Sequence, residues 1–114
     1  MELKTNELTG TALDWAVAKC EGIDSAVCGG VVWKGTKYSF NPSTNWAQGG
    51  PIIEREAIHL CGGAAQTYDS SKLPEDPWSE YFYVARGVTI LEAAMRCYVA
   101  SKLGDEIDIP EELI

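Results

Sequence analysis

Glycine residues divide this 114-residue chain into short segments, and this division limits every helix or strand to a short length. Gly22 and Gly104 each follow a stretch with helical periodicity, and glycine pairs at 29–30, 49–50 and 62–63 separate other segments. Glycine is favoured just beyond helix ends and in tight turns because it adopts backbone conformations that side chains disfavour. The chain is therefore expected to combine short helices with short strands.

Three segments carry apolar residues at helical spacing and have suitable residues at their starts. A threonine opens the first and the third, and an acid three residues later, Asp14 or Glu92, can complete a capping box. A proline opens the second at the first helical position, where no amide donor is needed, and its apolar stripe would extend to Leu60. The first predicted helix opens at the cap Thr11 and stops at Gly22, and the second opens at Pro51 and stops at Gly62. The third follows the cap Thr89 and stops at Gly104.

Other segments are rich in β-branched or aromatic residues, which is typical of strands. The predicted strands span residues 3–5, 31–33, 38–40, 64–69 and 78–85, with a loop at 70–77. The short turns between neighbouring strands favour antiparallel pairing. We therefore predict one α+β domain over residues 1–114: a small antiparallel sheet with helices packed on its faces, similar to an α-β-α sandwich.

The charge balance limits the partners of the chain. Nine basic residues face seventeen acidic ones, for a formal net charge of −8. Nucleic acid is not expected as a partner because phosphate contacts require lysine and arginine, and an anionic membrane surface is disfavoured for the same reason. The start of the chain does not resemble a signal peptide, and no apolar segment approaches a membrane span, so we expect a cytoplasmic protein.

No grouping of reactive side chains points to catalysis, so we expect no enzyme, no cofactor and no metal. His59 is the only histidine, and no nucleophile motif surrounds any serine or cysteine. The four cysteines have no zinc spacing and are expected to be free thiols; they are Cys20, Cys28, Cys61 and Cys97. The protein is therefore expected to act by binding.

The chain resembles the NinX-like proteins of tailed phages in three segments. These segments are ELTGTALDWAVAK at 7–19, YSFNPSTNWAQGGPIIERE at 38–56 and AAMRCYVASKLG at 93–104. The resemblance implies an accessory protein from the early region of lambda-like phage or prophage genomes, with an α-β-α architecture. It implies no activity and no catalytic residue.

The central segment provides a candidate ligand site. Trp46 supplies an aromatic face, the expected helix start after Gly50 supplies backbone donors, and Arg55 supplies a guanidinium. Such groups suit a planar anionic ligand. The alternative is that Trp46 fills the core and Arg55 pairs with a glutamate of its own helix. The full candidate set is Asn41, Ser43, Thr44, Trp46, Gly49, Gly50, Arg55 and Arg96.

Three hypotheses follow for the function. The first is a non-catalytic binding protein of the host cytoplasm that forms a homo-oligomer. The second is that it sequesters a small anionic, nucleotide-derived signal of host defence. The third is that its acidic surface inhibits a host protein.

Overall fold

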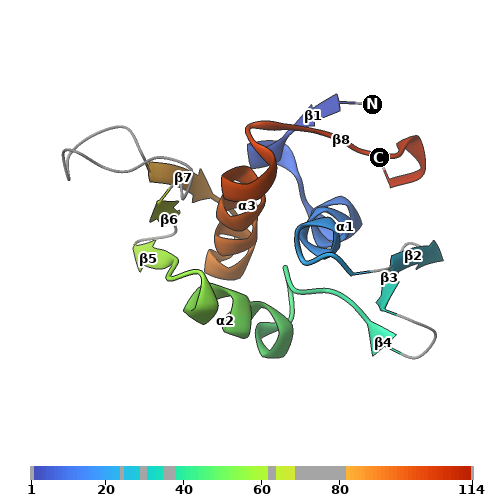
Figure 1. The fold of residues 1–114 in the computed structure, drawn as a ribbon, viewed down its shortest axis with the longest axis horizontal. Helices are drawn as coiled ribbons and strands as arrows, with labels where there is room; N and C mark the ends of the chain where they lie inside the picture. The colour runs from blue at the N-terminus through green and yellow to red at the C-terminus, as the bar shows by residue number, and fades with distance from the viewer. Residues whose placement is uncertain are drawn as a thin grey trace.

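A computed structural model describes residues 2–23, 25–28, 31–34, 38–61, 64–68 and 82–113 of the chain. Among these residues the α-helices are separated along the sequence by groups of strands (Figure 1). The α-helices are α1 (Gly10–Cys20), α2 (Trp46–Arg55) and α3 (Ile90–Leu103), and the short 3-10 helices are η1 (Thr5–Glu7) and η2 (Glu111–Leu113). The strands are β1 (Glu2–Lys4), β2 (Ser25–Cys28), β3 (Val31–Lys34), β4 (Tyr38–Ser39), β5 (His59–Cys61), β6 (Ala64–Tyr68), β7 (Phe82–Arg86) and β8 (Glu106–Asp108).

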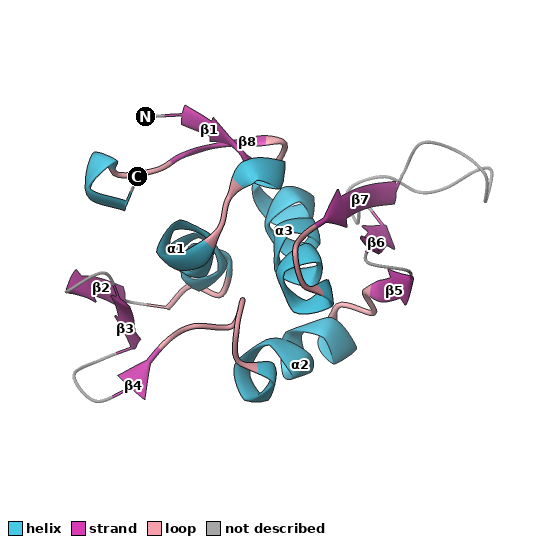
Figure 2. Cartoon of the chain, turned by 180° about the vertical axis from the view of Figure 1, so that it is seen from behind, coloured by secondary structure: helices cyan, strands magenta, loops and turns pink. Residues whose placement is uncertain are grey.

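Helix α3 is the centre of the molecule. It packs against α1 on one side, against β6 and β7 on another, and against α2, as Figures 1 and 2 show from opposite directions. Its side chains are buried around most of its circumference: Leu91, Ala93, Ala94, Met95, Cys97, Tyr98, Val99 and Ala100. The small residues among them allow neighbouring elements to approach closely, so α3 forms the core of the fold.

The described strands form small antiparallel sheets at the periphery of the helices. The sheets are β1-β8, β2-β3-β4 and β5-β6-β7. The first joins the two ends of the chain, with Leu3 opposite Ile107. The α+β class with small antiparallel pairing is therefore confirmed, and the described strands are distributed over three sheets because short turns pair only neighbours and the chain ends pair with each other.

The helix ends show which local signals dominate. Helix α3 starts after Thr89, whose hydroxyl accepts a hydrogen bond from Glu92 N at 3.1 Å, and it ends at Gly104 with φ +90°, as predicted. Helix α1 ends before Gly22 as predicted, but it starts at Gly10. The cap predicted at Thr11 is therefore wrong, because Thr11 and Asp14 both lie inside the helix.

Both predicted ends of α2 are wrong. The helix starts at Trp46 because the Asn45 side chain accepts from Ala47 N at 3.0 Å, so Pro51 lies within it. It ends at Arg55 because Ala57 adopts a left-handed conformation with φ +51°, and Ile58 N then donates to Ile53 O at 3.0 Å. This arrangement is a Schellman turn. Leu60, predicted to continue the helical stripe, lies in β5 instead.

The strand predictions agree with the structure at 3–5, 31–33, 38–40 and 64–69 within two residues at each end. Strands β2, β5 and β8 were not predicted, and β7 covers only the second half of the segment predicted at 78–85. Residues 78–81, the loop predicted at 70–77 and the glycine pairs at 29–30 and 62–63 lie outside the described residues.

Candidate functional site

The candidate segment begins with a braced turn before α2. Asn41 O accepts from Thr44 N at 3.1 Å and from Asn45 N at 3.0 Å. The Gln48 side chain reaches back across the turn: it accepts from Asn41 N at 2.7 Å and donates to Ser39 O at 2.8 Å. Thr44 is exposed, and its hydroxyl lies 3.4 Å from Asn41 O. Asn41 and Thr44 thus shape the turn that orients α2.

Ser43 anchors this turn to α1. Its side chain is buried, and its amide donates to Asp14 Oδ1 at 2.9 Å. Burial raises the pKa of the Asp14 carboxyl, while the Ser43 hydroxyl and amide lower that pKa in part. The Ser43 hydroxyl and Asn41 Oδ1 are both buried without a hydrogen-bond partner among the described residues. Asp14 is therefore an acceptor for the turn, and Ser43 belongs to the packed interior.

Replacing Asp14 by alanine should destabilise the fold by about 1–3 kcal/mol, because the buried amide of Ser43 loses its acceptor.

Asp14→Asn keeps an oxygen acceptor, and the Ser43 hydroxyl can accept from its amide group. Since the folded-state pKa of Asp14 is raised above 3.8, its protonation favours the folded state at low pH, and this contribution is lost as pH rises through the folded-state pKa. In urea unfolding, the stability of Asp14→Asn relative to wild type should therefore increase as pH rises from about 4 to about 7. A constant difference over that range would contradict the assignment.

Gly49 and Gly50 lie inside α2, so the predicted open helix start after Gly50 is wrong. Gly49 N donates to Asn45 O at 2.9 Å, and Gly49 itself is buried. A Cβ atom at Gly49 would lie 2.6 Å from both Pro42 O and Leu91 Cδ1. Gly49 is therefore required for the close approach of α2 to the turn and to α3, and it offers no free amide to a ligand.

Trp46 does not fill the core, because 52% of it is exposed. It lies at the first turn of α2, and the nearest atom to a Cβ built at Gly50 is Trp46 Cε3, at 4.0 Å. Ala47, Pro51 and Glu54 are exposed on the same side of the helix. We call Trp46, Ala47, Gly50, Pro51 and Glu54 the outer face of α2. It is apolar apart from one carboxylate.

Arg55 is committed to neighbouring helices. Its guanidinium forms two hydrogen bonds with the Glu21 carboxylate, at 3.1 and 2.9 Å, and a third with Tyr98 Oη at 3.2 Å. Arg55 Nε also lies 3.3 Å from Glu56 Oε2, and Lys102 Nζ lies 2.9 Å from Glu56 Oε1. The hydrogen bond from Lys102 is the main cause that lowers the pKa of Glu56. These pairs tie the C-terminal ends of α1, α2 and α3 together.

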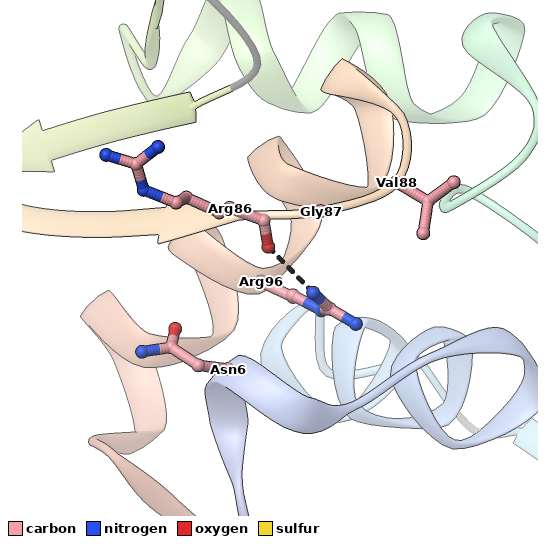
Figure 3. Close-up of a pocket in the computed structure, with 5 residues that line it drawn as sticks. All are labelled: Asn6, Arg86, Gly87, Val88 and Arg96. Carbon is pink, nitrogen blue, oxygen red and sulfur yellow. Dashed lines mark hydrogen bonds between the residues drawn. The ribbon is translucent and has the colours of Figure 1, made fainter.

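Arg96 lies on the other side of α3 from Tyr98, because residues two positions apart in a helix are about 200° apart around its axis. Arg96 therefore cannot join Arg55, which contacts Tyr98. Its Nε donates to Leu8 O at 2.6 Å and its Nη1 to Arg86 O at 2.7 Å, as Figure 3 shows for the latter. Its Nη2 pairs with Glu92 Oε1 at 2.8 Å. Arg96 therefore holds the bend after β7 against α3 and against the segment before α1.

The structure thus divides the predicted site. Ser43 and Gly49 are packing residues, Arg55 and Arg96 hold separate ion-pair networks, and Trp46 remains open to a partner. Glu54 was not among the predicted site residues. Its spacing of eight residues from Trp46 indicates a shared helix face once Asn45 is recognised as the cap of α2. The candidate residues do not form one ligand pocket.

Other reactive groups give no catalytic grouping within the described part of the chain. Burial raises the pKa of the Cys20 thiol to about 12, which keeps this thiol protonated. His59 lies on the exposed strand β5. No cluster of three metal-ligating side chains occurs among the residues described, and none of their helices has the length and apolar character to traverse a bilayer.

Comparison with known families gives one clear result. The family model described as Bacteriophage P22, NinX matches residues 4–102, which include α1, α2 and all of α3 except its last residue. No curated protein matches the chain.

Proposed function

The chain belongs to the Bacteriophage P22 NinX family, and we propose that this phage accessory protein acts without catalysis, by binding a basic segment of a host protein in the host cytoplasm. The observation that carries the proposal is the exposure of Trp46 on the outer face of α2. A tryptophan that is not used by the core is costly to leave in water, and tryptophan is enriched among residues that dominate binding energy.

The chemistry of the outer face favours a cationic partner. The indole of Trp46 offers an aromatic face to lysine or arginine, and Glu54 offers a carboxylate further along the same side of α2. The net charge of −8 adds long-range attraction for a basic surface and repels a second copy of the chain. A basic host segment therefore fits this face better than another NinX-like chain does.

Capture from host lysate with immobilised protein tests this proposal. Wild type should retain a host protein at low salt and release it at moderate salt. Trp46→Ala should weaken the interaction about 30-fold, since a central aromatic contributes about 2 kcal/mol or more, and Glu54→Gln should weaken it less. Because Trp46 is 52% exposed and does not belong to the buried core, its replacement should leave the melting temperature nearly unchanged.

Leu103→Ala is a matched control, because Leu103 is a 37% exposed apolar residue on a different helix. It should retain the host protein as wild type does. Equal retention by Trp46→Ala and wild type would contradict the proposal. Sedimentation separates the remaining case: a wild-type dimer that Trp46→Ala converts to monomer would assign the outer face to a second copy instead.

A further inference from the structure

An open hollow lies at the end of β7, away from the outer face of α2. Figure 3 shows its lining residues: Asn6 from η1, Arg86, Gly87 and Val88 from the end of β7 and the bend that follows, and Arg96 from α3. Its volume is about 570 Å³, which is within the usual range for sites that hold small molecules. The hollow therefore has room for a metabolite.

The lining is unusually basic for this chain. Only three arginines occur among the 114 residues, and two of them, Arg86 and Arg96, line the hollow. The charge of Arg96 is balanced by Glu92, whose Oε1 lies 2.8 Å from Arg96 Nη2. Arg86 is exposed, and no acidic side chain in the described part of the chain pairs with it. The described lining of the hollow therefore carries a net positive charge in a protein of net charge −8.

The frame of the hollow is rigid. Arg96 holds the bend through Arg86 O, and Gly87 packs so tightly on the first turn of α3 that a Cβ atom there would lie 2.8 Å from Ala93 N. Because this contact is with backbone, the bend cannot shift easily. The side chain of Arg86 thus extends from fixed backbone, which lowers the cost of ordering it on binding.

We propose that this hollow binds the phosphate group of a small phosphorylated metabolite, with Arg86 as the principal contact. A guanidinium binds phosphate through two parallel hydrogen bonds. None of the described residues that line the hollow is aromatic, so the proposal assigns recognition to the phosphate and not to a base. A polyanion such as nucleic acid is disfavoured by the overall acidic charge, whereas one phosphate is small enough to experience mainly the local charge.

Calorimetry with inorganic phosphate, AMP and adenosine tests the site. Phosphate and AMP should bind with similar affinity, and adenosine should not bind. Arg86→Gln should weaken both anions by about tenfold or more, because a hydrogen bond to a charged group contributes about 1.5–3 kcal/mol. Arg86→Lys should recover part of the affinity, because lysine restores the charge but not the paired donors.

Lys19→Gln is the matched control, since it removes one positive charge from an exposed position on α1. It should leave phosphate affinity within about twofold of wild type. Equal phosphate affinity in Arg86→Gln and wild type, or no phosphate binding at millimolar concentration, would overturn the proposal. Tight binding of adenosine would also overturn it. Host-protein capture by Arg86→Gln should stay at the wild-type level, so failure here is distinct from failure of the outer face of α2.

Discussion

Replacing Arg96 by alanine should be among the most destabilising single substitutions in this chain, with an expected loss of about 3–5 kcal/mol. The side chains of Arg96 and its partner Glu92 are each only 13% exposed, so the substitution leaves a largely buried carboxylate without its cation. It also removes the donors to Leu8 O and Arg86 O, which lie 2.6 and 2.7 Å from the guanidinium. Urea unfolding followed by circular dichroism measures the loss.

Two further variants keep this prediction testable if Arg96→Ala fails to fold. Arg96→Lys retains the charge beside Glu92 but cannot reach both carbonyl groups, so an intermediate loss is expected. Arg86→Ala removes an exposed arginine from the same hollow and should change stability by less than about 0.5 kcal/mol. If Arg86→Ala and Arg96→Ala cost the same, Arg96 does not organise the bend.

Helix α3 shows what local sequence signals can predict. Thr89 at its start and Gly104 at its end occupy the expected positions, and the apolar spacing between them is helical. Both signals depend on residues within one turn of the helix end, so tertiary packing does not need to be known. The Glu92 side chain departs from the predicted capping box, because it pairs with Arg96 and lies 3.4 Å from Val88 N.

Helix α2 shows where local signals compete. Pro51 is well suited to a first helical position. The side chain of Asn45, however, accepts from Ala47 N and so caps a helix that starts at Trp46, five residues before Pro51. Pro51 then costs only the hydrogen bond to Ala47 O, and Ala47 is exposed, so water can replace the missing donor. Propensity alone could not decide between the two starts, because the packing of Gly49 against Leu91 and Pro42 O determines the choice.

The site residues depended still more on distant contacts. Arg55 was considered a ligand contact or a partner for a glutamate of its own helix, yet its bidentate partner is Glu21, 34 residues away. Arg96 binds Leu8 O, 88 residues away. The sequence contains no local sign of either pairing. For Trp46 the helical periodicity gives only a partial signal, since its position is about 120° around the axis from the buried Ile52.

Gly49→Ala should destabilise the protein by about 1–3 kcal/mol, although alanine favours helices more than glycine does. The added Cβ would lie 2.6 Å from Leu91 Cδ1, which can rotate away, and 2.6 Å from Pro42 O, which cannot move without the turn at 41–45. Because that turn is held by Gln48 and by the bond from Ser43 N to Asp14, relief of the clash must break packing elsewhere.

Gly50→Ala provides the opposite result in the same helix. Apart from its chain neighbours, its Cβ would meet only Trp46 Cε3, at an ordinary contact distance of 4.0 Å, so the gain in helix propensity, reduced by the contact with the ring of Pro51, should stabilise the protein by less than about 1 kcal/mol. Thermal unfolding of the two variants should therefore shift in opposite directions. Shifts of the same sign would mean that α2 does not approach Pro42 O as closely as the structure places it. In that case the turn would no longer fix the start of α2, and the orientation of Trp46 toward a partner would lose its physical cause.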